Sequence, residues 1–186
     1  MKRCAILVVF AAGATTWLPA DLAVTVGSRH AALVVQDTRF DPAVQLVSDV
    51  ALGLGAQWEL HGGRGGTLGT GLGVRVTRVS RSTAFGGYYY RGLAVRSLAL
   101  SGAWTSPSGA GVRIAGSASF ASYALTTLLF FYPEVEVAPT LRTRLTERAR
   151  VEWALPVFYQ FRQDLAYAVG VGLRATVALE FSSPES

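Results

Sequence analysis

Cysteine is almost absent from this chain of 186 residues, because Cys4 is the only one. A single cysteine, placed before an apolar N-terminal stretch, excludes a disulfide framework. Histidine is nearly as scarce, since His30 and His61 are the only two. Two separated histidines without cysteine ligands do not form a metal site, so we expect no metal and no cofactor.

Long apolar runs are also missing after the N-terminus. The longest, from Leu125 to Tyr132, is interrupted by two threonines, whereas a membrane-spanning helix needs about 20 apolar residues. A transmembrane helix is therefore not expected.

Lysine is represented only by Lys2, so arginine supplies the other basic residues of a chain with net charge +5. The arginines are scattered, with no dense basic run and no basic helix, which argues against a nucleic-acid partner. Arginine's planar guanidinium suits buried pairing with carboxylates better than an ammonium group does. Codon bias gives the same composition, and both explanations stay open.

The first 20 residues have the features of a secretion signal. Lys2 and Arg3 precede an apolar stretch, Ala5–Ala12, that is too short to span a bilayer. Small residues such as those in Ala12–Ala14 permit cleavage, which we place between positions 14 and 23. The alternative is a buried N-terminal strand or helix. Residues 21–186 are expected to form a single domain.

The second half of the chain alternates apolar and polar residues over long stretches. From Ala149 to Phe161 the odd positions are apolar, and from Leu165 to Phe181 the same parity repeats. A period of two indicates a strand with unlike faces. Ordinary strands have about 5–6 residues, and these runs are much longer. The lipid-facing wall of a transmembrane β-barrel is the environment that favours such a pattern.

The same pattern places further strands along the chain. The predicted fold is all-β, an eight-stranded antiparallel up-and-down transmembrane β-barrel, since an even strand number is expected and closure leaves no edge strand in hydrocarbon. The expected strands lie near Leu22–Val35, Val44–Leu60, Thr67–Ser80, Tyr88–Trp104, Ala110–Phe120, Glu134–Leu145, Ala149–Phe161 and Leu165–Phe181, and an extension of the fifth as far as Phe131 stays open.

Three strands break the alternation and are expected to be irregular. A bulge near Ser28–Arg29 would turn Ala31, Leu33 and Val35 outward. A second bulge, near Arg96–Ser97, would turn Arg96 inward. Pro139 has no N–H for the ladder, so a bulge or irregular pairing is expected there.

The inward positions carry most of the charges, and a lone charge in a narrow lumen is costly, so they should be paired. One interpretation is a packed polar plug, and the other is a thin water-filled path lined by arginine. The predicted lumen-lining charges are Asp49, Glu59, Arg75, Arg96, Arg113, Glu136, Arg142, Arg144, Glu152 and Arg174.

Aromatic residues gather near both ends of the expected strands, as they do at membrane interfaces. The periplasmic girdle is predicted to contain Trp58, Trp104, Trp153 and Phe181. The outer girdle is predicted to contain Tyr88, Tyr90, Phe130, Phe131, Tyr132, Tyr159 and Phe161. The segment 128–132 is interpreted as part of this girdle, with an apolar mouth for a hydrophobic solute or a partner as the alternative.

The signal-like Met1–Ala20, the strand count and the C-terminal strand Leu165–Phe181 together resemble small outer-membrane barrels of the OmpW, OmpX and OmpA-transmembrane type. The composition is also similar to that of barrels from spirochaetes. Barrels of this type usually end in an aromatic residue, whereas here Ser182–Ser186 follow Phe181.

The resemblance implies an integral protein of the bacterial outer membrane, with outer-membrane lipid and the assembly machinery as partners and an oligomeric state left open. Passage of small or hydrophobic solutes, as in OmpW-like porins, is the first expected function. A non-conducting structural or surface-exposed barrel is the alternative. Some small barrels modify lipid A, and His30 lies where such a site would be, but Ser28 and Asp37 beside it show no catalytic spacing. An enzyme is not expected.

Overall fold

The computed structural model describes residues 21–36, 44–62, 66–80, 94–122, 129–161 and 167–181. No helix in these ranges is long and apolar enough to cross a membrane. Their regular structure is entirely β. The strands are β1 (Asp21–Gln36), β2 (Val44–His61), β3 (Thr67–Ser80), β4 (Ala94–Thr105), β5 (Ala110–Ser122), β6 (Leu129–Phe131), β7 (Glu134–Arg144), β8 (Ala149–Ala154), β9 (Val157–Gln160) and β10 (Tyr167–Phe181).

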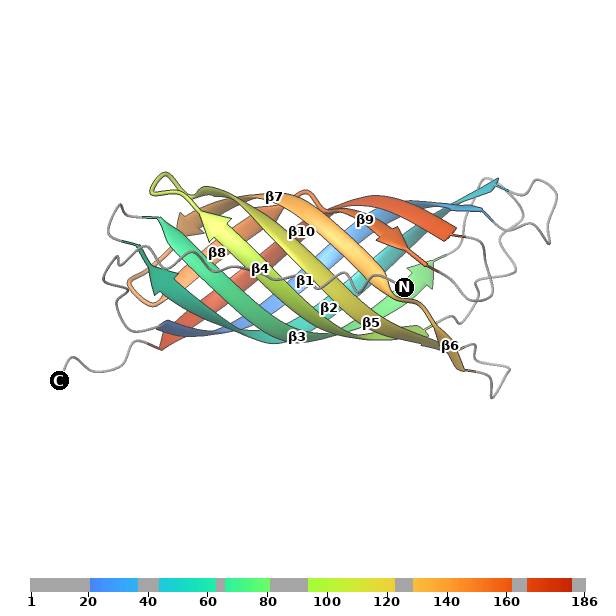
Figure 1. Ribbon diagram of the computed structural model, residues 1–186, viewed down its shortest axis with the longest axis horizontal. Helices are drawn as coiled ribbons and strands as arrows, with labels where there is room; N and C mark the ends of the chain where they lie inside the picture. Colours follow the sequence, from blue (N-terminus) through green and yellow to red (C-terminus); the bar gives the residue numbers. More distant parts are fainter. Residues whose placement is uncertain are drawn as a thin grey trace, which may run out of the picture.

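The strands close into a barrel, because neighbours along the chain pair antiparallel and β1 pairs with β10 (Figure 1). β6 and β7 are two parts of one barrel strand, since both pair with β5 in one register. β8 and β9 are likewise two parts of one strand, and both lie against β7 and β10. The predicted eight-stranded antiparallel up-and-down barrel is therefore confirmed.

The strands are tilted, and the register around the barrel measures the tilt. A path that follows directly paired residues once around the barrel returns to β1 ten residues from its start. It passes through Leu22, Trp58, Thr70, Gly102, Ile114, Val137, Val157, Val171 and Ala32. On eight strands such a shift corresponds to a tilt of roughly 40°.

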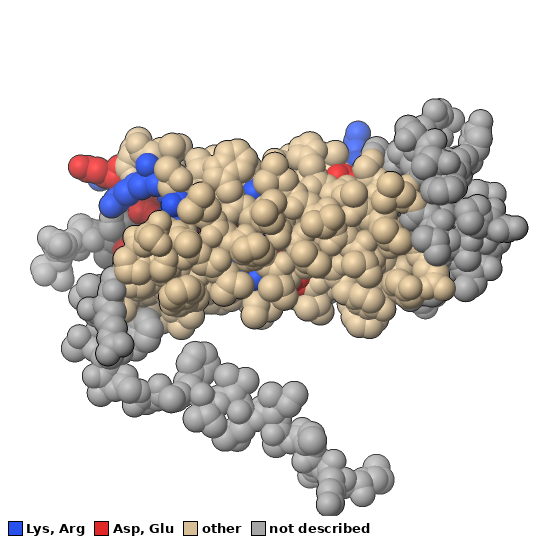
Figure 2. Space-filling view, turned by 90° about the horizontal axis from the view of Figure 1, so that it is seen from above, with Lys and Arg blue, Asp and Glu red and all other residues tan. Residues whose placement is uncertain are grey.

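The barrel wall is inverted relative to that of a water-soluble protein, with apolar side chains on the outside and charged side chains on the inside. Within the described ranges, 35 large hydrophobic side chains are exposed on the outside, among them Leu52, Leu100 and Val171. Buried positions instead include Arg29, Glu136 and other charged or polar residues. In the view of Figure 2, charged side chains cluster at one end, and only a few charged atoms are visible along the rest of the wall.

The two predicted bulges in β1 and β4 are wrong. Both strands keep an unbroken register with both neighbours. As a result Ala31, Leu33 and Val35 point inward and are buried, and Arg96 points outward and is exposed. Apolar side chains at inward positions gave the false impression that the parity had changed.

The irregularity predicted at Pro139 is a missing ladder hydrogen bond, and the strand has no bulge there. Pro139 accepts a bond from the Leu155 N–H at 3.1 Å but has no N–H to return one. The register is the same on both sides of this point, where Thr140 faces Ala154 and Val137 faces Val157.

Candidate functional site

The lumen is the only place in the described structure where charged side chains converge in number. We call the end where β1 begins at Asp21 and β10 ends at Phe181 the terminal end, and the opposite end the loop end. The terminal end is on the left in Figure 1. From the terminal end to the loop end, the lumen holds a charged cluster, a cavity, a second charged cluster and an apolar plug.

The terminal-end cluster is a chain of alternating charges across β2, β5, β7, β8 and β10. Arg113 pairs with Glu152 at 2.7 Å, and Glu152 also pairs with Arg142 at 3.1 Å. Arg142 continues to Glu59 at 2.9 Å, and Glu59 accepts from Arg150 at 2.7 Å. The chain ends with an ion pair between Arg150 and Glu180. Each inner carboxylate in it therefore meets two arginines.

The loop-end cluster is centred on Arg29, which is 2% exposed. Its guanidinium pairs with Asp49 at 3.1 Å and with Glu134 at 3.0 Å. Arg75 also reaches Glu134, at 2.6 Å. Glu136 forms further ion pairs with Arg29, Arg75 and Arg174. This cluster joins β1, β2, β3, β7 and β10 across the lumen.

The two clusters together are electrically neutral. Six arginines face six carboxylates: Arg29, Arg75, Arg113, Arg142, Arg150 and Arg174 against Asp49, Glu59, Glu134, Glu136, Glu152 and Glu180. Removing an ion from water is expensive unless a partner compensates it. A neutral set of this kind fills a narrow lumen without leaving an excess charge there.

A cavity of about 140 Å³ lies between the clusters. Glycines of β1, β2 and β3 form much of its wall, so no side chains fill the space there. Arg29, Arg75, Arg113 and Arg174 also line it. The Nε atoms of Arg29 and Arg75 and Nη2 of Arg174 have no protein partner. A cavity of this size has room for several water molecules.

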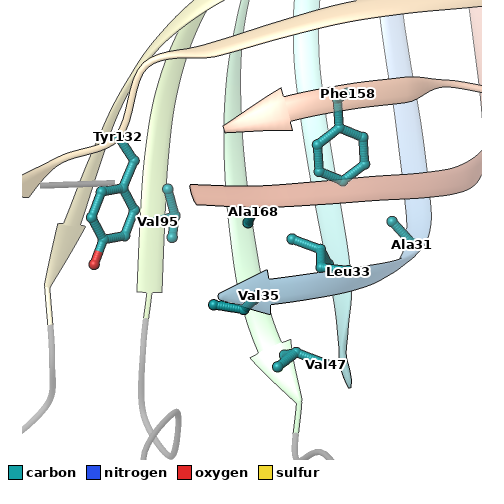
Figure 3. Close-up of a cluster of buried hydrophobic side chains, with 8 residues drawn as sticks. All are labelled: Ala31, Leu33, Val35, Val47, Val95, Tyr132, Phe158 and Ala168. Carbon is teal, nitrogen blue, oxygen red and sulfur yellow. The ribbon is translucent and has the colours of Figure 1, made fainter. Parts of the chain in front are cut away.

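The loop end of the lumen is filled by apolar side chains, the apolar plug shown in Figure 3. Phe158 and Tyr132 are its largest members and are almost fully buried. The plug consists of Ala31, Leu33, Val35, Val47, Val95, Tyr132, Phe158 and Ala168. Leu33 and Val35 follow Arg29 along β1, so the plug lies on the loop-end side of the second cluster.

Eight of the ten predicted lumen charges point inward and join the clusters. Arg96 does not, because β4 has no bulge. Arg144 does not either, because β7 ends there. Its side chain is exposed and donates to the backbone carbonyls of Thr146 and Glu147.

The sequence prediction missed Arg29, which pairs with three carboxylates in the loop-end cluster. The signal was present, because strict alternation from Leu22 places Arg29 inward with Ala31 and Leu33. Because a bulge was expected near Ser28–Arg29, Arg29 was not assigned to the lumen.

The aromatic residues at the terminal end point outward. Trp58, Trp104, Trp153 and Phe181 are 41–56% exposed. Leu22 of β1 is paired with both Trp58 of β2 and Phe181 of β10, so these two aromatics lie on either side of it at a similar level.

At the loop end, Phe131, Tyr159 and Phe161 point outward, and the rings of Tyr159 and Phe161 are 4.5 Å apart. The assignment of Tyr132 to the outer girdle is wrong, because its side chain points into the lumen and is 0% exposed. Tyr88 and Tyr90 lie outside the described residues, and so does the side chain of Phe130.

The two histidines lie far from each other. His30 is exposed on the outer face of β1, next to Val50 and Leu173 on the adjoining strands. His61 lies at the terminal end, where its Nδ1 is 3.6 Å from Asp21. Neither histidine belongs to the lumen clusters.

A solved structure of another protein has a similar fold. No family model matches the chain, and no curated protein matches its sequence. Among solved structures, the chain is similar to the crystal structure of Neisserial surface protein A, with a TM-score of 0.55. The match covers 88% of this chain and 100% of that one at 10% sequence identity. This likeness supports the barrel architecture alone.

Proposed function

We propose that the protein is an integral barrel of the bacterial outer membrane whose closed lumen gives it a structural or surface-exposed role. The observation that carries the proposal is the inverted wall, with large hydrophobic side chains outside and ion pairs inside. An exposed apolar surface of this extent is unfavourable in water. Hydrocarbon is the solvent that matches it.

The height of the apolar wall supports the membrane assignment. Twelve residues of β10 separate Phe181 from Val169, the residue that faces Tyr159 on β9. At about 3.3 Å per residue and a tilt of roughly 40°, they cover about 30 Å, the thickness of a bilayer's hydrocarbon core. The two aromatic rows therefore lie where the two interfaces would be.

The contents of the lumen favour the closed alternative over a porin. Two ion-paired clusters and an apolar plug occupy successive levels of the barrel, and the cavity lies between the clusters. Ion movement would require breaking paired charges and wetting apolar side chains. The resemblance to the OmpX and OmpA types agrees with a role that needs no pore.

The first experiment tests the membrane assignment. The chain is folded in detergent micelles and run on a gel with and without boiling, and we expect the unboiled barrel to migrate differently. Monodisperse folding without detergent would contradict the proposal and would instead indicate a soluble lipid-binding barrel.

The second experiment tests the closed lumen by planar-bilayer recording. We expect no steady conductance from the folded barrel. A stable open channel would overturn the closed-lumen proposal while leaving the membrane assignment intact.

Passage of small or hydrophobic solutes, as the OmpW resemblance implies, is the second candidate. The cavity of about 140 Å³ is the observation that favours it. Uptake of a solute into vesicles containing the barrel, above the uptake of empty vesicles, would support this candidate over a structural role.

A lipid-modifying activity is a third possibility that we do not propose. His30 faces outward, apart from the charged clusters. Unchanged lipid A in cells that carry His30→Ala would agree with this, and altered lipid A would revive the enzyme hypothesis.

A further inference from the structure

Two arginines differ from the other described arginines in where they point. The structure describes ten arginines, of which six are in the lumen clusters and two, Arg144 and Arg148, are at a terminal-end turn. Arg78 on β3 and Arg96 on β4 instead project from the outer wall and are exposed. Within the described residues, neither of them forms an ion pair.

The two side chains are neighbours. Arg78 faces Ala94 and Arg96 faces Val76 across the β3–β4 pair, so they are diagonal neighbours on one face, at a distance of about 7–8 Å or slightly less. Val50 of β2 lies between His30 of β1 and Arg78 of β3 and is paired with both. The outer wall of β1 to β4 thus carries a small group of nitrogen donors at this level.

That level is the loop-end row of aromatic side chains. Arg96 faces Phe120 on β5, and Phe120 faces Phe131 on β6. The rings of Phe120 and Phe131 are 5.4 Å apart, and both point outward. We orient the barrel with the predicted periplasmic girdle, which contains Trp58 and Trp104, at the terminal end. Arg78 and Arg96 are then at the outer interface, where guanidinium groups reach the lipid headgroups.

We propose that Arg78 and Arg96 bind phosphate groups of a phosphorylated glycolipid in the outer leaflet. The inference rests on the proposed function, because it needs the barrel to be in the membrane. Anionic headgroups are favourable partners for two cations that form no ion pair within the described residues, and the guanidinium group binds phosphate through two parallel hydrogen bonds. Within the described structure, no protein carboxylate takes that place.

The test compares lipid A binding by folded barrels in neutral micelles, measured by native mass spectrometry. The variant is Arg78→Gln/Arg96→Gln, and the matched control is Arg144→Gln/Arg148→Gln, which removes two exposed arginines from the terminal end. We expect the first variant to bind at least about tenfold more weakly, since two charge-assisted contacts are lost. The control should bind like the unaltered protein.

A second measurement needs no variant. The unaltered barrel should bind lipid A more tightly than the same lipid after its phosphates are removed, and added salt should reduce this difference. Equal binding of the two lipids, or equal binding by Arg78→Gln/Arg96→Gln, would overturn the proposal. The heat-dependent gel shift is recorded on the same samples, so loss of the barrel itself would be seen separately as failure of the membrane assignment.

Discussion

The guanidinium carbon of Arg29 lies 4.1 Å from the centroid of the Phe158 ring. Arg29 belongs to the loop-end cluster, and Phe158 belongs to the apolar plug. The ring faces Gly170 across the β9–β10 pair. A cation over an aromatic face is attracted by its quadrupole, so this contact joins the charged layer of the lumen to the apolar one.

Arg29→Met is expected to destabilise the barrel by about 3–5 kcal/mol, because it leaves buried carboxylates with fewer partners. The free energy of unfolding in urea, followed by tryptophan fluorescence of the barrel in lipid vesicles, measures the effect. Arg144→Met is the control, because its side chain is exposed at a turn, and it should change stability by less than about 0.5 kcal/mol. A similar loss in both variants would contradict a special role for Arg29.

Gly170→Ala is expected to cost about 1–3 kcal/mol through overpacking. A Cβ atom at Gly170 would overlap the Phe158 ring, whereas a Cβ at Gly102 would meet nothing within 4 Å. Gly102→Ala is therefore the matched control and should be nearly neutral. In a Phe158→Leu background the effect of Gly170→Ala should shrink, which a double-mutant cycle detects. An unchanged effect in that background would refute the steric explanation.

Gly109→Ala should destabilise the barrel by about 1–3 kcal/mol, because a left-handed backbone is unfavourable for alanine. Gly109 has φ +86° in the turn between β4 and β5, and its N–H donates to the Ser106 carbonyl at 3.0 Å. A Cβ there would also overlap the carbonyl oxygen of Arg142. Urea unfolding of Gly109→Ala beside Gly102→Ala checks this prediction, and equal stabilities would show that the turn tolerates the change.

Leu54→Arg is expected to destabilise the barrel in a bilayer by about 2–4 kcal/mol, because its position is near the middle of the lipid-facing wall. Leu54 is 54% exposed and lies between Val26 and Val74 on the neighbouring strands. Leu145→Arg makes the same change at the terminal-end rim, where the residue is 61% exposed, and should cost only about 0–1 kcal/mol. Equal costs at the two depths would argue that water, and not hydrocarbon, contacts the wall.

The strands with an apolar outer face and a small, polar or charged inner face could be predicted closely. In β2, for example, Leu52 and Leu54 point out while Asp49 and Gln57 point in. The period of two gave the parity, and the polar lumen made the two faces distinguishable. For that reason eight of the ten predicted lumen charges lie inside.

Prediction failed where the lumen itself becomes apolar. Ala31, Leu33 and Val35 were assigned to the lipid side because they are hydrophobic, yet they belong to the plug. Tyr132 was assigned to a girdle for the same reason. A sequence pattern separates faces only when the two environments differ, and at this end of the barrel both are apolar.

The sequence by itself determined that the chain forms long strands with one apolar face and one small, polar or charged face, since this follows from local periodicity and composition. Only the tertiary structure decided which arginine meets which carboxylate, that the charges balance, and that an apolar layer closes one end. Those features depend on side chains such as Arg29 and Glu134, which lie 105 positions apart in the chain. A stagger of ten residues around eight tilted strands brings such residues to one level, and no local pattern encodes that closure.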